Sequence, residues 1–178
     1  MAVRMELSRI LIRELNDYQI IELREVAPVA DDGVEGAGGA AGAEPGGTNG
    51  EGTAGGTGAS GPAYSQVEGG RSFPIVIGLP EAQAIERRLK GVAAKRPQTH
   101  DLLMNVIEAL GGRLESITIN DLSEQTFFAL LHVRDRSGRL TNIDSRPSDA
   151  IALGIASNVP IYVAEHVLDS AQKDEGEK

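Results

Sequence analysis

A long stretch of the chain, residues 31–70, has a composition unlike that of its flanks. It holds fifteen of the 22 glycines and six acidic residues, but no lysine or arginine. A segment with so little apolar surface cannot offset the entropy that is lost on ordering. We therefore expect a Gly-rich, acidic, disordered insertion at 31–70 that interrupts one domain over residues 1–171, and a charged tail at 172–178. The core must come from the two flanking parts.

The net charge of −9 is distributed unevenly along the 178 residues. The insertion contributes −6, residues 169–178 contribute −2 and residues 1–30 contribute −1, whereas residues 71–168 hold eleven acidic and eleven basic side chains. The folded part therefore lacks the basic surface typical of nucleic-acid-binding proteins, but it also carries too little negative charge to repel a polyanion strongly. Charge alone does not exclude an RNA or DNA partner.

Two absences narrow the chemistry and the location. The chain has no cysteine, which excludes disulfides, zinc–thiolate sites and cysteine nucleophiles. No apolar run approaches the roughly 20 residues that span a bilayer, and the first residues lack the apolar stretch of a secretory signal. We expect a cytoplasmic protein with no membrane partner.

The apolar residues alternate between strand-like and helix-like periods. Strands are expected over residues 5–13, 18–26, 72–77, 113–119, 126–133, 140–143 and 160–164, and helices from Gly78 onward and over 99–110, 147–156 and 165–171. This order predicts an α+β fold, a mixed, largely antiparallel sheet packed with about three to four helices. Pro74 cannot donate to a ladder, so the third strand is expected to lie at an edge or to be irregular there. The second helix should present one apolar face, made of Leu103, Val106, Ile107 and Leu110.

Two of these helices begin with similar polar segments. One is Arg96–Asp101 and the other is Asp144–Asp149, and each supplies an arginine, a proline, a hydroxyl and a carboxylate. A helix start carries unpaired N–H groups and partial positive charge, so it can hold an anion such as phosphate. A nearby arginine strengthens such binding. The chain contains no P-loop, dinucleotide fingerprint or EF-hand motif that would offer other chemistry.

The basic and hydroxyl residues of these segments have two interpretations each. Arg96 and Arg146 could clamp phosphate oxygens, or they could pair with the carboxylates of their own turns. Thr99 and Ser148 are expected to cap the helices first and to contact phosphate second. His100 is the best placed of the three histidines for a general base, and a packed or solvent-facing histidine is the alternative.

The carboxylates also have two interpretations. Asp101, Asp144 and Asp149 could hold a divalent cation such as Mg²⁺, which prefers carboxylate oxygens. Their structural alternative is N-terminal capping and a favourable interaction with the helix dipole.

Five blocks of sequence, in order and with compatible spacing, resemble the bifunctional nuclease domain family. The blocks are Phe73–Gly78 with Glu81, Ala82, Ala84 and Ile85, then Arg96–Leu102, then Asp121–Leu122 with Thr126–Ala129, then Asp144–Leu153, and finally Pro160–Val163 with Glu165. The resemblance covers nearly the whole folded part. It implies an α+β domain, often self-associating, that cleaves RNA and DNA. The insertion is atypical of the family, and Ser145 stands where the family motif often has alanine.

Two hypotheses about function remain open at this point. The first is a homo-oligomeric nuclease that hydrolyses phosphodiester bonds of RNA, DNA or both. Its phosphate clamps would be Arg96 and Arg146 and its general base His100, while Asp144 and Asp149 would hold a metal ion or a water. The second is a non-catalytic module that binds a phosphorylated ligand or a partner protein. The low basic content and the absence of tryptophan for base stacking favour the second.

Overall fold

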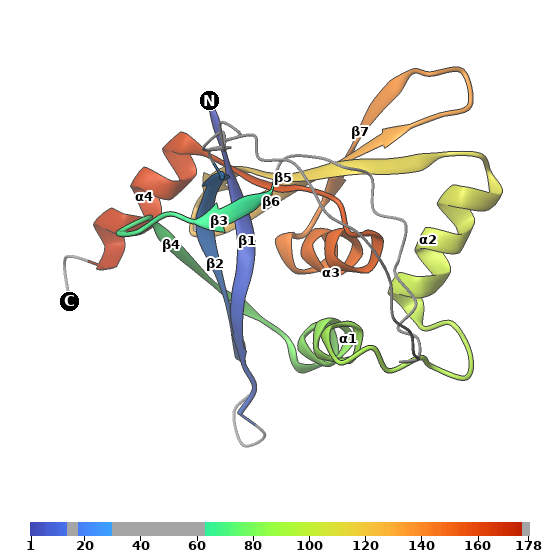
Figure 1. The fold of residues 1–178 in the computed structure, drawn as a ribbon, viewed down its shortest axis with the longest axis horizontal. Coiled ribbons are helices and arrows are strands. Elements are labelled where there is room, and N and C mark those ends of the chain that lie inside the picture. Colours follow the sequence, from blue (N-terminus) through green and yellow to red (C-terminus); the bar gives the residue numbers. More distant parts are fainter. Residues whose placement is uncertain (14–17, 30–62, 176–178) are drawn as a thin grey trace, which may run out of the picture.

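The computed structural model describes residues 1–13, 18–29 and 63–175, which form one α+β domain (Figure 1). The described strands are β1 (Ala2–Leu11), β2 (Gln19–Pro28), β3 (Tyr64–Gln66), β4 (Ser72–Ile77), β5 (Arg113–Ser123), β6 (Thr126–Arg134), β7 (Leu140–Ser145) and β8 (Ile161–Ala164). The described helices are α1 (Leu79–Leu89), α2 (Thr99–Ala109), α3 (Pro147–Ser157) and α4 (Glu165–Glu175). None of these helices is long and apolar enough to cross a membrane. The predicted fold class is confirmed.

The described strands form one mixed sheet in the order β3-β2-β1-β8-β5-β6-β7, with β4 also bonded to β2. Every pairing is antiparallel except that of β5 with β8. The parallel pair arises because the chain leaves β7, passes through α3 and returns between β1 and β5. β3 and β4 share the second edge of β2, since β4 pairs with its first half and β3 with its last three residues.

The predicted insertion extends too far toward the C-terminus. β3 lies inside residues 31–70, and the guanidinium carbon of Arg4 lies 3.5 Å from the centre of its Tyr64 ring. Tyr64 thus packs a short strand against the domain. The average composition of residues 31–70 did not indicate this strand. The rest of the predicted insertion, residues 31–62, lies outside the described residues. At the other end, α4 continues to Glu175 and so enters the predicted tail, whose residues 176–178 lie outside the described part.

α3 is the central helix of the domain. Its residues Ala150–Gly154 are all buried, and it contacts α1, α2, β5 and β6. A helix that is apolar around its circumference must be covered on several sides. Ile151 and Leu153 are fully buried. Burying one such side chain stabilises a fold by about 1.5–3 kcal/mol, so the packing of α3 holds the elements that contact it in place.

Side chains from β4 and from β6 meet in the core. β4 buries Phe73, Ile75 and Ile77 on one face. The Phe73 ring meets the edge of Phe127 from β6, with ring centroids 5.3 Å apart. β4 bonds to β2 alone among the described strands, as expected for an edge strand that contains Pro74. The helix that follows β4, α1, therefore starts close to the C-terminal half of the sheet.

The apolar face predicted for α2 is largely exposed. Only Met104 of this helix is buried, whereas Leu103 and Val106 are about half exposed and Leu110 is 75% exposed. The helical period was predicted correctly, but the period does not tell whether the same chain covers the apolar stripe. α2 therefore presents an apolar surface beside the polar residues at its N-terminus.

Candidate functional site

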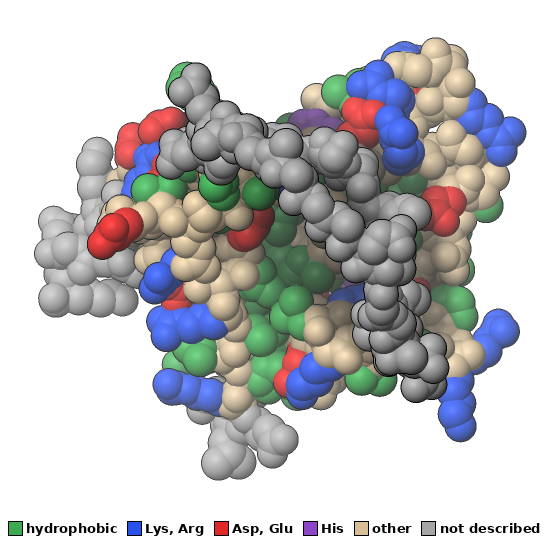
Figure 2. All heavy atoms as spheres, in the orientation of Figure 1, with side chains coloured by type: hydrophobic (Ala, Val, Ile, Leu, Met, Phe, Trp, Pro, Cys, Tyr) green, Lys and Arg blue, Asp and Glu red, His purple; other side chains and the backbone are tan. Residues whose placement is uncertain are grey.

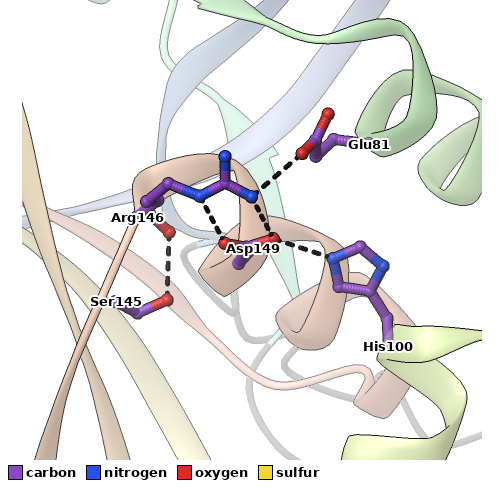
Figure 3. A network of polar contacts seen from close by, with 5 residues as sticks. All are labelled: Glu81, His100, Ser145, Arg146 and Asp149. Atoms are coloured by element: carbon purple, nitrogen blue, oxygen red, sulfur yellow. Dashed lines mark hydrogen bonds and ion pairs between the residues drawn. The ribbon is translucent and has the colours of Figure 1, made fainter.

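The N-termini of α1, α2 and α3 meet in one cluster of polar side chains (Figure 3). α1 contributes Glu81 from its third residue, α2 contributes His100 from its second, and α3 contributes Asp149 from its third. Arg146, the N-cap residue of α3, lies between the two carboxylates. We call these four residues the polar cluster. The sequence predicted the starts of α2 and α3 as anion sites, and the structure places the start of α1 beside that of α3.

Asp149 is the hub of the polar cluster. Its Oδ2 accepts a hydrogen bond from Nε of Arg146 at 2.7 Å, and its Oδ1 accepts one from Nη2 at 3.1 Å. Nε2 of His100 lies 3.0 Å from the same Oδ1. Arg146 also donates from Nη2 to Oε1 of Glu81, at 2.9 Å. Nη1 of Arg146 has no hydrogen-bond partner among the described residues, so its two N–H groups can bind a ligand.

Local sequence explains how Arg146 and Asp149 meet. Arg146 precedes Pro147, which disfavours the helical conformation for the preceding residue, and Arg146 is extended, with φ −71° and ψ 145°. Pro147 then suits the first helical position, where its missing N–H costs nothing. Asp149 stands three residues after Arg146, within the first turn, where a carboxylate also interacts favourably with the helix dipole. The second sequence interpretation of Arg146, pairing within its own turn, is therefore what the structure shows.

Gly78 makes room for Glu81. A Cβ atom at residue 78 would lie 2.6 Å from Oε2 of Glu81, closer than real contacts of this kind. The side chain of Glu81 is only 14% exposed, so its carboxylate is held near Arg146 rather than in open solvent. Glycine at residue 78 thus leaves the space that the carboxylate of Glu81 occupies.

The protonation of the His100–Asp149 pair follows from the surroundings of Asp149. Burial raises the pKa of Asp149 most strongly, but hydrogen bonds from Arg146 and His100 together outweigh it and hold the pKa below its ordinary value. The carboxylate is therefore ionised at neutral pH and can only accept hydrogen bonds. A neutral His100 must then carry its proton on Nε2, which leaves a lone pair on Nδ1.

Two hollows adjoin the polar cluster. A groove of about 610 Å³ is lined by Arg146 and Ser148, and a smaller one of about 440 Å³ is lined by Thr99 and His100. The N-cap residues are Gln98 and Arg146, with Thr99 and Pro147 at the first helical positions. The prediction that Thr99 and Ser148 cap the helices is therefore wrong, because each cap falls one or two residues earlier. Both hydroxyl residues instead border space that a ligand can enter.

Asp101 is not part of the polar cluster. It accepts hydrogen bonds from the backbone N–H of Gln98 and from the side chains of Arg87 and Arg88 at the end of α1. Burial is the largest single influence on the pKa of Asp101 and raises it. The three donors together lower that pKa by more, so it lies below its ordinary value. Arg96 is exposed and has no ion pair with any described residue. The expected Arg96–Asp101 pair is thus replaced by pairs with arginines of the preceding helix.

Asp144 lies on the other face of the sheet. It pairs with Leu130 of β6, whereas its neighbour Ser145 pairs with Ala129, which is fully buried against the core. Because successive strand residues point to opposite faces, Asp144 faces away from α3. No group of three or more His, Asp or Glu among the described residues could hold a metal ion. Asp101, Asp144 and Asp149 therefore do not fit as a set of ligands for one divalent cation.

The outer face of the sheet, opposite α3, carries a second histidine. Oγ1 of Thr118 and Oδ1 of Asn142 each lie 2.8 Å from one ring nitrogen of His132. Figure 2 shows basic side chains gathered over the nearby hairpin of β6 and β7. These are engaged locally: Arg134 with Glu115, Arg136 with the carbonyl of Ala109, and Arg139 with Asp135.

Sequence reasoning missed Glu81 as a member of the site. It stands within the family-like block after Phe73–Gly78, and an acidic residue in a first helical turn has an ordinary explanation in the helix dipole. Only the packing of α1 against α3 reveals that it contacts Arg146. Arg87 and Arg88, the partners of Asp101, gave no signal beyond a charged helix surface.

Comparison with known proteins finds a match that includes all four residues of the polar cluster. A family model described as the bifunctional nuclease domain matches residues 65–176. Two uncharacterized proteins from two strains of Mycobacterium tuberculosis are each 44% identical over 106 residues. The matched part covers 60% of this chain and 62% of each relative. The chain spans less than two thirds of those relatives, but the family match covers most of it, and the chain belongs to the bifunctional nuclease domain family.

Proposed function

We propose that this protein is a nuclease that cleaves phosphodiester bonds of RNA, DNA or both at the polar cluster. The observation that carries the proposal is the His100–Asp149 pair, held at 3.0 Å beside a guanidinium that keeps two N–H groups free. A base, a group that orients it and a donor for phosphate oxygens are the parts that phosphodiester cleavage needs. Membership of the bifunctional nuclease domain family supports the same reaction class.

In this proposal Asp149 orients His100. By accepting a hydrogen bond from Nε2–H it keeps the ring in one tautomer, so Nδ1 can take a proton from the attacking hydroxyl. The attacking group is the 2′-hydroxyl of RNA or a water molecule, and the leaving oxygen takes a proton from solvent as its bond to phosphorus breaks. Nη1 of Arg146 donates to a non-bridging phosphate oxygen and stabilises the charge that develops as the bond breaks.

The charge of the polar cluster suits a phosphate only because of the helices. With His100 neutral, Glu81 and Asp149 outweigh Arg146 by one negative charge. Each helix start contributes roughly half a positive charge, so three of them together supply about +1.5. This partial charge offsets the excess carboxylate. An isolated pair of carboxylates on a loop would repel the substrate.

No step of the proposal passes through a metal ion, because the predicted ligands do not form one group. The requirement for a divalent cation such as Mg²⁺ stays a prediction of the sequence. It is tested by measuring cleavage in a chelator and again after Mg²⁺ is restored.

The deciding experiment is a cleavage assay on highly purified protein with labelled single-stranded RNA and DNA. We expect His100→Ala to lower the rate by about 10² to 10⁴-fold, the usual contribution of a general base. His132→Ala is the matched control, because that histidine lies on the outer face of the sheet, and we expect its rate to equal that of the wild type. Equal rates for His100→Ala and the wild type, with both folded, would contradict the proposed site.

The ion pairs of three arginines favour the alternative, a non-catalytic binding module. Arg146 already has two carboxylate partners, and Arg87 and Arg88 share Asp101. Such pairing is also what a structural network would show. A purified protein that binds inorganic phosphate or a partner protein but never cleaves either nucleic acid would support this alternative.

We also propose that the chain self-associates through the exposed apolar face of α2. The face comprises Leu102, Leu103, Val106 and Leu110, which are 42–75% exposed. An apolar stripe of this kind is typical of a surface that another subunit covers. Leu110→Glu should shift the mass measured by light scattering toward that of a monomer. A cytoplasmic location, the last expectation from the sequence, stays a prediction.

A further inference from the structure

The groove of about 610 Å³ extends beyond the polar cluster. Its walls are residues 74–78 of β4 and the following turn, residues 125–127 of the β5–β6 hairpin, and residues 146–148 at the start of α3. Tyr18, just before β2, completes the lining. Small-molecule sites in proteins generally have about 300–1,000 Å³. The groove therefore has room for a ligand unit next to the phosphate that Arg146 is proposed to hold.

Tyr18 is an aromatic side chain that the fold leaves available. Phe73 and Phe127 pack on each other, and Tyr64 lies under Arg4. Tyr18 is 51% exposed, and it borders the groove. An exposed ring at a groove wall offers a flat surface on which a nucleobase can stack, an interaction that every base can make.

The hairpin wall of the groove is conformationally strained. Glu124 and Gln125, which connect β5 to β6, have φ angles of 48° and 60°. Two consecutive left-handed residues in a hairpin turn favour Asn-Gly, and side chains such as those of Glu and Gln are disfavoured there. Of the two, only Gln125 lines the groove. Its amide can both donate and accept hydrogen bonds, as recognition of a base edge requires.

We propose that this groove binds the nucleobase of the nucleotide whose phosphate contacts Arg146, with Tyr18 stacking on the base and Gln125 contacting its edge. The inference rests on the proposed nuclease function and names the substrate as an unpaired, single-stranded nucleotide. Bases within a duplex are stacked on both sides and cannot enter such a groove. A peptide strand added to β4 is a poorer fit, because Pro74 interrupts the ladder of N–H donors.

The test compares two probes, adenosine monophosphate and ribose 5-phosphate, in calorimetric titrations of the full chain. The two share the sugar and the phosphate and differ in the base. We expect the wild type to bind the nucleotide about tenfold more tightly, since a base that stacks on an aromatic ring adds to the binding energy. Tyr18→Ala should abolish this preference without changing the affinity for ribose 5-phosphate, and Tyr18→Phe should retain it.

Two controls separate the groove from general effects. Phe128→Ala removes an aromatic ring that is 39% exposed on the opposite side of β6 from Phe127, and it should keep the full preference. Gln125→Gly and Glu124→Gly should both raise the melting temperature, because glycine relieves the left-handed strain. Only Gln125→Gly should weaken nucleotide binding, by about three- to tenfold for a lost neutral hydrogen bond.

The outcomes distinguish this inference from the proposed function. A nucleotide preference that is lost in Tyr18→Ala supports the base site even if the protein cleaves nothing. Equal affinity of the wild type for both probes, or a preference that survives in Tyr18→Ala, overturns the base site even if cleavage is confirmed. Binding of an extended peptide that competes with the nucleotide and depends on β4 would also overturn it.

Discussion

Two of the histidines, His100 and His132, stand in different parts of the molecule and in different chemical surroundings. His100 lies where three helix starts meet and is bonded through one nitrogen to a carboxylate. His132 lies on the outer face of the sheet, and both of its nitrogens are occupied, by a hydroxyl and by an amide oxygen. Oδ1 of Asn142 must accept from Nδ1, so Nε2 accepts from Thr118 and the ring has no free lone pair.

The difference shows that histidine content alone does not identify a catalytic base. His132 is fixed in a neutral network and has nothing left to offer a substrate. His100 is oriented by a charged partner through Nε2, its Nδ1 has no hydrogen bond to any described residue, and the residue lines a groove. The same contrast extends to the carboxylates and arginines of the two regions, and each pair can be tested against the other.

The largest effect is expected from the two aspartates of one motif, Asp144 and Asp149. Asp149→Asn replaces the acceptor that orients His100 by an amide that can hold the wrong tautomer, and we expect cleavage to fall by about 10³-fold or more. Asp144→Asn changes the outer face only and should leave the rate unchanged. Steady-state rates on single-stranded RNA provide the measurement. A similar loss in both variants would mean that the sheet face also takes part.

The second comparison concerns two paired arginines, Arg146 and Arg134. Arg146→Lys keeps the charge but loses the planar fork that binds two carboxylates and a phosphate oxygen together, so kcat should fall by about 10- to 100-fold. Arg134→Lys disturbs the pair with Glu115 and the hydrogen bond to the carbonyl of Gly138, neither of which involves the polar cluster, and should not change kcat. Equal values of kcat for Arg146→Lys and the wild type would show that Arg146 does not bind the phosphate during cleavage.

The third comparison is one of stability against pH. The hydrogen bonds from Arg134 and Arg113 lower the pKa of Glu115 to about 2, and Arg146 and His100 lower that of Asp149. A folded-state pKa below the unfolded one means that each group stabilises the fold above its unfolded pKa, near 4 to 4.5. This stabilisation is lost as the pH falls through the folded-state value.

Denaturant titrations between about pH 5 and pH 2 measure this effect. Glu115→Gln and Asp149→Asn should each lose less unfolding free energy over that range than the wild type does. Above pH 5 the difference between each variant and the wild type should be constant. A variant with the same pH slope as the wild type would show that its ion pair does not favour the folded state.

Much of the fold could be predicted from the sequence because it depends on local periods. The strand over 126–133 and the helix from Pro147 follow from patterns that span a few residues. The length of α4, the short strand β3 and the exposed face of α2 could not be predicted in this way. Each depends on what packs against the segment, and for α2 the period is the same whether the stripe is covered or open.

In the candidate site too, contacts between residues close in sequence could be predicted and contacts between distant residues could not. The pairing of Arg146 with Asp149 was one of two expectations, and it is local, since three residues separate the partners within one helical turn. The contact of His100 with Asp149 joins residues 49 positions apart, and that of Glu81 with Arg146 joins residues 65 apart. Only the packing of α1 and α2 against α3 creates these contacts. Asp144 lies apart from the polar cluster although it is close to Asp149 in the sequence, because neighbours in sequence fall on opposite faces of a strand.

The smallest effect on cleavage is expected from alanine substitutions at two glycines, one in the β6–β7 turn and one beside the polar cluster. Gly138, in the β6–β7 turn, has φ +86° and open space around it, so Gly138→Ala strains the backbone and should lower stability by about 1 kcal/mol without changing cleavage. Gly78 has φ −76°, which alanine adopts freely, but a Cβ there would displace the carboxylate of Glu81. Gly78→Ala should therefore leave the melting temperature nearly unchanged.

The same Gly78→Ala change should alter cleavage a few-fold, because Glu81 is one of two carboxylates that fix the guanidinium of Arg146. A rise in the rate would mean that Glu81 restrains Arg146 and competes with phosphate for it, and a fall would mean that Glu81 orients Arg146 toward the substrate. If Gly138→Ala altered the cleavage rate and Gly78→Ala did not, the result would contradict the assignment of the active site to the polar cluster.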